Sequence, residues 1–181
     1  MPRLFVAVDL PSRVREEAAN LCHGVERAHW VDMSQFHLTL EFIGEVDAGR
    51  CEDIAAALEE VAAAPFALAL KGVGHFPPRK AARVLWAGMS PSAELERLQA
   101  HVRGALRGIG VQGEDRTFHA HITLARFREP VPLHVVAPFI AAHSLFASAP
   151  FDVTEFHLYS SVLARSGAAH TIERTYPLDA G

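Results

Sequence analysis

The chain has few cysteines and no long apolar run, and each shortage excludes a class of protein. Cys22 and Cys51 are the only cysteines among 181 residues. They fit neither a disulfide framework nor the spacing of a metal site, so we expect reduced thiols. No apolar run approaches the roughly 20 residues that a membrane-spanning helix requires. Because Met1 leads directly into a strand pattern and not into a signal peptide, we expect a cytoplasmic protein with no membrane partner.

An excess of positive charge is also absent. Lysine and arginine number 17 against 21 aspartates and glutamates, which gives a formal net charge of −4. A protein that coats nucleic acid draws its affinity from many phosphate contacts, so this balance argues against that class. A small or terminal phosphate can still be bound by a few local groups. Half of the residues are hydrophobic, which is ample for a buried core, and no linker or low-complexity segment interrupts the chain.

Hydrophobic periodicity and turn residues predict the secondary structure. Strands are expected at residues 3–9, 30–33, 36–43, 66–76, 83–89, 118–127, 151–163 and 170–176. Helices are expected at residues 12–28, 47–64, 93–109 and 133–143. Asp47 and Ser92 are the expected N-caps, Gly44 and Gly110 should end their elements, and a turn is expected at residues 166–167. Strand-helix-strand-strand order recurs in both halves, which predicts an α+β fold with mostly antiparallel sheets.

One tetrapeptide pattern occurs twice, as residues 37–40 (HLTL) and again as residues 121–124 (HITL). Successive side chains of a strand point to opposite faces, so each histidine shares a face with the threonine two residues later. The repetition suggests two similar halves, and a pseudo-twofold arrangement would bring both strands to one cleft. Two imidazoles in one cleft can donate and accept protons near neutral pH. The pattern therefore predicts general acid-base chemistry on an anion.

The motifs and their flanks resemble the two-histidine phosphoesterases, most closely the RNA 2′,3′-cyclic phosphodiesterase branch, also called 2′-5′ RNA ligase-like proteins. The resemblance covers nearly the whole chain. Besides both motifs, it rests on residues 3–11 (RLFVAVDLP), 36–46 (FHLTLEFIGEV), 72–77 (GVGHFP), 82–88 (ARVLWAG), 121–126 (HITLAR) and 158–161 (LYSS). It implies a bilobal α+β fold of two pseudo-symmetric lobes, with mostly antiparallel sheets flanked by helices around a central cleft. Residues 1–181 would then form a single domain of two intertwined lobes with one motif each.

The resemblance also implies an activity: hydrolysis of an RNA or nucleotide 2′,3′-cyclic phosphate to a 2′-phosphate, with no metal and no cofactor. His37 would be the proton donor to the leaving 3′ oxygen, and His121 the proton acceptor that activates water. Thr39, Thr123 and Arg126 would bind the phosphate. The partner would be an RNA with a 2′,3′-cyclic phosphate end or a cyclic nucleotide, and we expect a monomer. The chemistry agrees, because this reaction needs a base, an acid and donors to the phosphoryl oxygens.

Three positions raise structural questions. Arg126 comes five residues after His121, so an ideal strand would point it to the opposite face, and a bulge or the end of the strand is needed to bring it to the phosphate. Ala120 stands where the family commonly has proline. His170 stands where a tyrosine is common.

Several alternatives remain open at this point. Phe76, Trp86 and Tyr159 either stack a base or belong to the core, and the basic turn with Arg79, Lys80 and Arg83 either guides RNA or is simply solvated. The same enzyme could run in reverse and join RNA ends through a 2′-5′ linkage. The cleft could instead belong to a non-catalytic nucleotide- or RNA-binding module. In a third alternative, a metallohydrolase, His37, His119 and His121 would ligate a transition metal.

Overall fold

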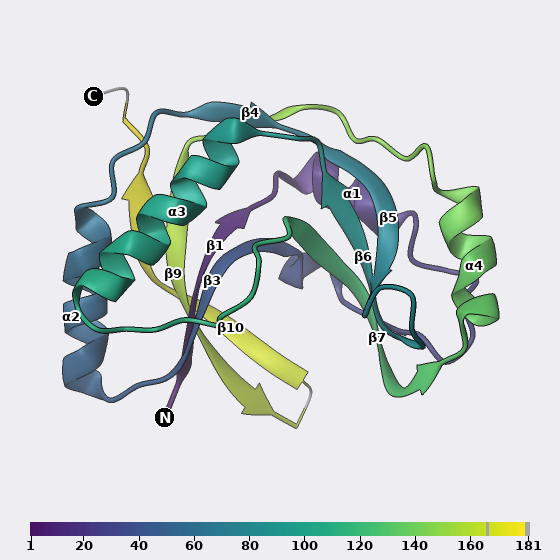
Figure 1. The fold of residues 1–181 in the computed structure, drawn as a ribbon, viewed down its shortest axis with the longest axis horizontal. Helices are drawn as coiled ribbons and strands as arrows, with labels where there is room; N and C mark the ends of the chain where they lie inside the picture. Colours follow the sequence, from purple (N-terminus) through teal and green to yellow (C-terminus); the bar gives the residue numbers. More distant parts are fainter. Residues whose placement is uncertain (166, 180–181) are drawn as a thin grey trace.

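A computed structural model describes residues 1–165 and 167–179, and within them the chain forms two four-stranded antiparallel sheets, one two-stranded sheet and four α-helices (Figure 1). The first sheet has the order β10-β9-β1-β3, and the second has the order β2-β7-β6-β5. The strands are β1 (Arg3–Asp9), β2 (His29–Trp30), β3 (His37–Glu45), β4 (Phe66–Leu68), β5 (Leu70–Phe76), β6 (Ala82–Met89), β7 (His121–Val131), β8 (Phe151–Val153), β9 (Glu155–Ala164) and β10 (Gly167–Pro177). The helices are α1 (Ser12–Ala19), α2 (Ala48–Glu59), α3 (Ala93–Gly108) and α4 (Leu133–Ala142), with a 3₁₀ turn η1 at Met33–Gln35.

The chain passes repeatedly between the two sheets, so the two lobes are intertwined. It leaves β1 in the first sheet, enters the second sheet as β2 and returns to the first as β3. Helices α2 and α3 lie against the first sheet, and α4 lies on the outer side of the second (Figure 1). The Tyr176 hydroxyl on β10 donates to the Ala55 carbonyl on α2 at 3.0 Å, and Trp30 packs on Phe139 of α4. The predicted bilobal α+β fold with mostly antiparallel sheets is confirmed.

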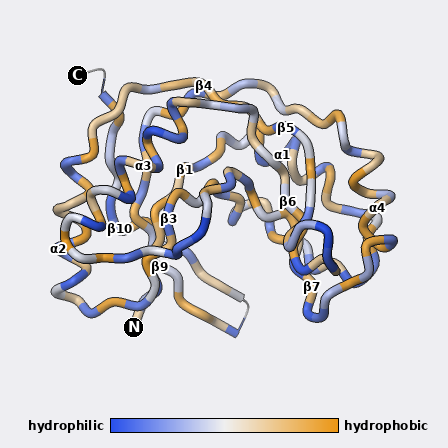
Figure 2. The backbone as a smooth tube through the Cα atoms, in the orientation of Figure 1, coloured by the Kyte–Doolittle hydropathy of each residue, from blue (hydrophilic) through white to orange (hydrophobic). Residues whose placement is uncertain are grey.

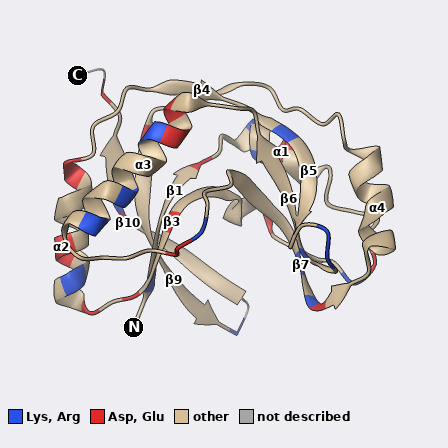
Figure 3. Cartoon of the chain, in the orientation of Figure 1, with Lys and Arg blue, Asp and Glu red and all other residues tan. Residues whose placement is uncertain are grey.

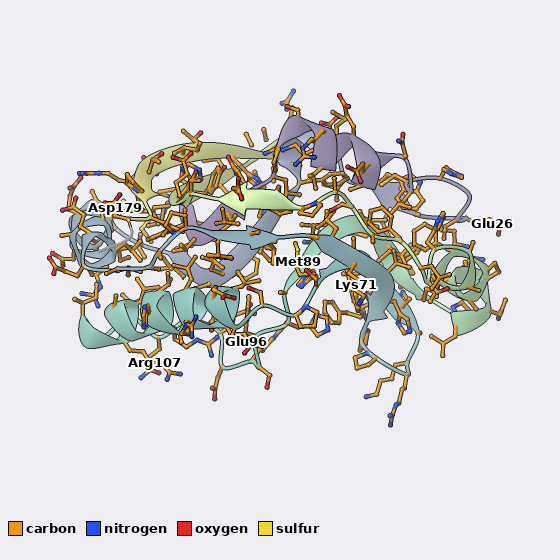
Figure 4. The ribbon with its side chains drawn as sticks, turned by 90° about the horizontal axis from the view of Figure 1, so that it is seen from above. Glu26, Lys71, Met89, Glu96, Arg107 and Asp179 are labelled. Carbon is orange, nitrogen blue, oxygen red and sulfur yellow. The ribbon has the colours of Figure 1, made fainter. Side chains whose placement is uncertain are left out.

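One continuous hydrophobic cluster joins both sheets and the helices. Helix α3 shows how the sequence builds it, because its four apolar positions recur at helical spacing and all are buried: Leu95, Leu98, Val102 and Leu106. Burial of each such side chain stabilises the fold by about 2 kcal/mol. Glu96 and Arg107 project from the opposite, outer side of the helix (Figure 4). A second, small cluster of Phe5, Ala7 and Tyr159 lies on the other face of the first sheet.

Most predicted helix boundaries agree with the structure. The Asp47 side chain accepts a hydrogen bond from the Arg50 amide at 2.8 Å, and that of Ser92 accepts one from the Leu95 amide at 3.1 Å, as expected of N-caps. Gly110 follows α3 with a φ of +76°. Helix α1 is shorter than the predicted residues 12–28 and ends at Ala19, and helix α2 ends at Glu59, before the predicted residue 64.

The segment after α1 cannot continue the helix. Gly24 and Arg27 have φ values of +78° and +64°, which lie outside the right-handed helical region. In place of the strand predicted at residues 30–33, the structure has the two-residue strand β2, His29–Trp30. Asp32 instead caps η1, because its side chain accepts a hydrogen bond from the Ser34 amide.

Two strands predicted as continuous are each divided in two. The prediction for residues 66–76 is wrong at Ala69, because β4 pairs with β8 whereas β5 pairs with β6. The prediction for residues 151–163 is wrong at Thr154, because β8 and β9 also have different partners. Strand β3 continues past Gly44 to Glu45. Of the predicted turn, residue 166 lies outside the described residues and Gly167 begins β10.

Cys22 and Cys51 are both free, which agrees with the expected thiols. Across residues 1–165 and 167–179, none of the helices is both long and apolar enough to cross a membrane.

Candidate active site

A cavity of about 840 Å³ lies between the two sheets and receives both copies of the His-x-Thr pattern. His37 and Thr39 reach it from β3, and His121, Thr123 and Arg126 reach it from β7. Strands β3 and β7 contact each other, although they belong to different sheets. The structure therefore brings all five predicted site residues to one place.

A β-bulge in β7 turns Arg126 to the same face of the strand as His121. In the register of β6 with β7, Leu85 lies opposite Ala125 and Trp86 lies opposite Thr123, so Leu124 is the extra residue. The bulge reverses the alternation of faces, and Arg126 returns to the face that carries the motif side chains. The burial pattern records the same reversal, with two consecutive buried residues at positions 124 and 125.

Strand β3 carries an equivalent bulge. Val6 lies opposite Glu41 and Ala7 lies opposite Thr39, which leaves Leu40 as the extra residue. The fourth residue of each motif is thus bulged, and the sixth residue, counted from the histidine, returns to the cavity face. In β3 that residue is Phe42, which lines the cavity.

Each motif histidine is held by the backbone two residues before it. Nδ1 of His37 lies 2.7 Å from the Gln35 carbonyl oxygen, and Nδ1 of His121 lies 2.6 Å from that of His119. A carbonyl oxygen can only accept, so Nδ1 is the protonated nitrogen in both rings. This assignment leaves Nε2 of each imidazole as the nitrogen that can exchange a proton with a ligand.

The surroundings of both imidazoles favour the neutral ring in the free protein. Burial lowers the pKa of His37 to about 4, the Gln35 carbonyl opposes that shift, and the neighbouring His170 adds to it. Burial also lowers the pKa of His121, the His119 carbonyl again acts in the opposite direction, and the charges of His119 and Arg126 lower it further. Both rings are therefore neutral at neutral pH in the free protein.

Each motif histidine has an aromatic neighbour and a second histidine beside it. The ring centroid of His37 lies 4.9 Å from that of Phe5 and 5.2 Å from that of His170. The ring centroid of His121 lies 4.9 Å from that of Phe76 and 6.1 Å from that of His119. The position where the family commonly has tyrosine is thus a cavity-lining imidazole in this chain.

The three aromatic residues proposed for base stacking have different surroundings in the structure. Phe76 lines the cavity. Tyr159 is 9% exposed, does not line the cavity, and donates its hydroxyl to the Asp9 carboxylate. The ring of Trp86 covers Gly74, where a Cβ would lie 2.3 Å from the nearest ring atom. Sequence reasoning missed Phe42, whose only signal was that it holds, in the first motif strand, the position that Arg126 holds in the second.

Basic residues border the cavity on both sides. Arg83 and Arg126 line it from the second sheet, and Arg103 and Arg116 line it from α3 and the segment that leads to β7. Figure 3 shows Lys and Arg in the β5–β6 loop and in that segment, and Figure 2 shows both connections as hydrophilic. Both exposed basic residues of the β5–β6 turn, Arg79 and Lys80, lie outside the cavity lining.

A buried carboxylate on β3 holds helix α3 and lies against the segment that leads to β7. Glu41 is 4% exposed and accepts hydrogen bonds from Arg103 Nε at 2.8 Å and from Gln99 Nε2 at 3.1 Å. Gly113 lies against the other carboxylate oxygen, Oε1, which a Cβ on Gly113 would approach to 1.9 Å. Arg103 also donates to the Arg116 carbonyl at 3.4 Å, so the first motif strand is linked through α3 to the segment that precedes the second motif histidine.

The metal alternative is not supported by the arrangement of the described side chains. Within residues 1–165 and 167–179, no group of three or more His, Cys, Asp or Glu side chains is placed to hold a metal ion. His37, His119 and His121 line one cavity but do not form such a group.

The fold and the cavity together define a two-histidine phosphoesterase, in which each of two lobes supplies one His-x-Thr motif to a shared cleft. The chain belongs to the 2′-5′ RNA ligase superfamily, whose family model matches residues 10–164.

Relatives and solved structures agree with this membership along nearly the whole chain. An RNA 2′,3′-cyclic phosphodiesterase of Archaeoglobus fulgidus is 33% identical over 177 residues, which cover 96% of this chain and 99% of that protein. The crystal structure of TT0787 of Thermus thermophilus has a TM-score of 0.81 at 29% identity and covers 97% of each chain. That of E. coli LigT complexed with 3′-AMP has a TM-score of 0.80 at 30% identity and covers 98% of this chain and 99% of LigT.

Proposed function

We propose that the protein hydrolyses an RNA or nucleotide 2′,3′-cyclic phosphate to a 2′-phosphate, with His37 and His121 as the acid-base pair. One observation carries the proposal: two His-Thr pairs line one cavity, and both imidazoles are bound through Nδ1 so that Nε2 is free. The names of the relatives and the 3′-AMP bound to LigT support a nucleotide substrate.

The reaction needs one proton removed and one delivered. Nε2 of His121 takes a proton from water, and the water oxygen forms a bond to phosphorus. The bond from phosphorus to the 3′ oxygen breaks, and Nε2 of His37 delivers its proton to that oxygen. The Thr39 and Thr123 hydroxyls and the Arg126 guanidinium donate to the non-bridging oxygens, where negative charge increases in the transition state.

His37 must take up its proton from solvent when the anionic substrate binds. Because the pKa of His37 is about 4 in the free protein, its ring is neutral at pH 7. The cyclic phosphate is an anion, and an opposite charge next to an imidazole raises its pKa. Substrate binding and protonation of the acid are therefore coupled.

Charged groups around the two rings act on their protonation in different ways. Arg126 lies beside His121 and favours its neutral form, which is the form that accepts a proton. Asp9 favours the protonated form of His37 and so acts against the effect of burial. These charges do not assign the two roles by themselves, because His170 and Arg15 also favour the neutral form of His37, so the assignment of acid and base follows the resemblance.

Hydrolysis of the four nucleoside 2′,3′-cyclic phosphates, with a chelator present and the product isomers resolved, tests the proposal. The wild-type protein should release a 2′-phosphate, and His37→Ala and His121→Ala should each lose at least about 10²-fold in kcat. His134→Ala removes an exposed histidine on α4, outside the cavity, and should retain full activity.

Three outcomes contradict the proposal in different ways. Wild-type rates in both single variants would exclude the acid-base pair. Activity that is lost with the chelator and restored by a divalent metal would favour the metallohydrolase. Tight binding of a nucleotide monophosphate without any hydrolysis would favour the binding module.

A further inference from the structure

The two lobes supply positive charge to the cavity in different ways. In the second lobe, Arg126 lines the cavity beside His121 and is always charged. In the first lobe, the corresponding residue of the motif strand is Phe42, which has no charge. The basic side chain that lines the cavity beside His37 is instead His170 of β10. The cavity therefore has a permanent charge beside one motif histidine and a titratable group beside the other.

The imidazole of His170 is held in place by rings. Its centroid lies 5.1 Å from that of Phe5 at an interplanar angle of 72°, and 5.2 Å from that of His37 at 77°. These two edge contacts fix the ring beside the proposed acid. Within residues 1–165 and 167–179, hydrogen bonds reach ring nitrogens of four histidines, and His170 is not among them. Its two nitrogens are therefore available to a ligand in the cavity.

The groups around His170 leave its protonation to be decided by a ligand. His37 faces it from β3, and the ring centroid of Tyr159 on β9 lies 6.5 Å away. Arg3 of β1 shares the same face of the sheet and pairs with Glu45 at 3.3 Å. Burial lowers the pKa of His170, so the ring is neutral at pH 7 in the free protein. An anion beside the ring acts in the opposite direction and favours the imidazolium.

The proposed reaction changes the charge of the bound phosphate. A 2′,3′-cyclic phosphodiester carries one negative charge. A phosphomonoester carries about −1.5 to −2 charges at pH 7, because its second pKa is about 6. The product thus presents up to one more negative charge to the same side chains. An imidazole responds to that second charge by holding a proton, which the permanently charged Arg126 cannot do.

We propose that His170 is a titratable phosphate ligand, which binds the phosphomonoester product as an imidazolium. The inference rests on the proposed function, because it concerns the product of that reaction. The protons balance: the phosphomonoester gives up its second proton, that proton stays in the site on His170, and a charge-assisted hydrogen bond joins the imidazolium to the dianion. Affinity for the product therefore falls as pH rises above about 6, because the ring then loses its proton to solvent.

Two ligands of the same shape and different charge test the inference. Adenosine 2′-phosphate becomes a dianion, whereas adenosine 2′-sulfate stays a monoanion. Calorimetric titration at pH 7, in two buffers of different ionisation enthalpy, counts the protons taken up on binding. With the phosphate, the wild-type protein should take up more protons than His170→Tyr, by up to about one. His170→Tyr should weaken the phosphate roughly tenfold to hundredfold, and the sulfate by clearly less.

Two further variants separate charge from shape. His170→Arg supplies a permanent charge, so it should retain tight binding of adenosine 2′-phosphate and lose the additional proton uptake. His134→Tyr makes the same exchange on α4, outside the cavity, and should match the wild-type protein in affinity and in proton uptake. Circular dichroism confirms that each variant is folded.

Because binding needs no turnover, the inference and the proposed function can fail separately. If the wild-type protein hydrolyses no cyclic phosphate but proton uptake still falls in His170→Tyr, the proposed function fails and the titratable ligand stands. Equal proton uptake in the wild-type protein and His170→Tyr would overturn the inference. An equal loss of affinity for the phosphate and the sulfate would also overturn it, because the ring would then act through shape alone.

Discussion

Thr39 and Thr123 occupy matching positions in the two lobes, and their hydroxyls are the smallest groups on which the proposed mechanism depends. Each lines the cavity two residues after its histidine. A hydroxyl that donates to a phosphoryl oxygen is most valuable in the transition state, when that oxygen gains negative charge. The two residues are therefore expected to act on kcat more than on binding.

Replacement of either threonine by valine removes the donor and preserves the branched shape. Thr39→Val and Thr123→Val should each lower kcat roughly 10²-fold to 10³-fold for a nucleoside cyclic phosphate, as loss of one preorganised donor does elsewhere. Thr171→Val on the exposed face of β10 is the matched control. Steady-state kinetics measures the effect, and a change confined to KM would contradict a transition-state role.

Burial of His37 also makes the stability of the fold depend on pH. The folded pKa of about 4 lies below the ordinary value of 6.5, so between these values the unfolded chain binds a proton that the folded chain does not. The stabilisation is complete above about pH 6.5 and is lost as pH falls toward about 4.

A His37→Gln variant should flatten that dependence. The loss of unfolding free energy between pH 7 and pH 4 should be smaller than in the wild type by about 3 kcal/mol. Urea unfolding across that pH range measures it, and His134→Gln should follow the wild-type curve. Identical pH dependence in His37→Gln and the wild type would show that this ring is not desolvated as described.

At the scale of elements, the two bulges and the anchored segment before β7 place the site. The bulges bring a sixth residue to the cavity face, and Glu41 holds Arg103 of α3, which also donates to the Arg116 carbonyl in the segment before β7. Gly113 is required there, because a Cβ would lie 1.9 Å from a carboxylate oxygen that is buried and held by Arg103 and Gln99. Displacement of that carboxylate would disrupt a buried ion pair.

Two glycine-to-alanine substitutions should therefore have opposite effects. Gly113→Ala should destabilise the fold by about 1–3 kcal/mol, because the buried carboxylate loses partners. Gly104→Ala, in the exposed interior of α3 with no atom within 4 Å of the new Cβ, should stabilise it by about 0.5–1 kcal/mol. Thermal unfolding of both variants checks the pair, and equal midpoints would contradict the contact at Glu41.

At the scale of the whole molecule, the two lobes must deliver rings of opposite protonation to one phosphate. Both pKa values are lowered in the free protein, so the optimum of kcat/KM should lie below pH 6.5, with a bell-shaped profile. Bound phosphate raises both values, so the optimum of kcat should lie at higher pH than that of kcat/KM. Initial rates from about pH 4 to about pH 9 test this, with circular dichroism to confirm folding. An optimum of kcat/KM above pH 7 would contradict it.

Some expectations for the whole molecule stay predictions. The organisation of residues 1–181 as a single domain, the monomeric state, the cytoplasmic location and the absence of a metal requirement are expectations from the sequence and its resemblance. Ligation through a 2′-5′ linkage, the reverse of the proposed reaction, stays an alternative.

The motif pair, the α+β class, the caps Asp47 and Ser92 and the buried stripe of α3 could all be predicted from the sequence. These features depend on local periodicity and on residue types, which can be read from the sequence without knowledge of tertiary contacts. The sequence also placed the five candidate residues on two strands that could share a cleft. That these residues meet in one cavity depends on how the chain crosses between its two sheets, which the sequence does not show.

Strand pairing could not be predicted from the sequence, and several local features depend on that pairing. The breaks at Ala69 and Thr154 exist because the strand partners change there. The bulges at Leu40 and Leu124 exist only relative to β1 and β6. Arg126 and Phe42 reach the cavity because of those bulges. Hydrogen bonding between distant strands sets their register, and no local sequence pattern contains that information.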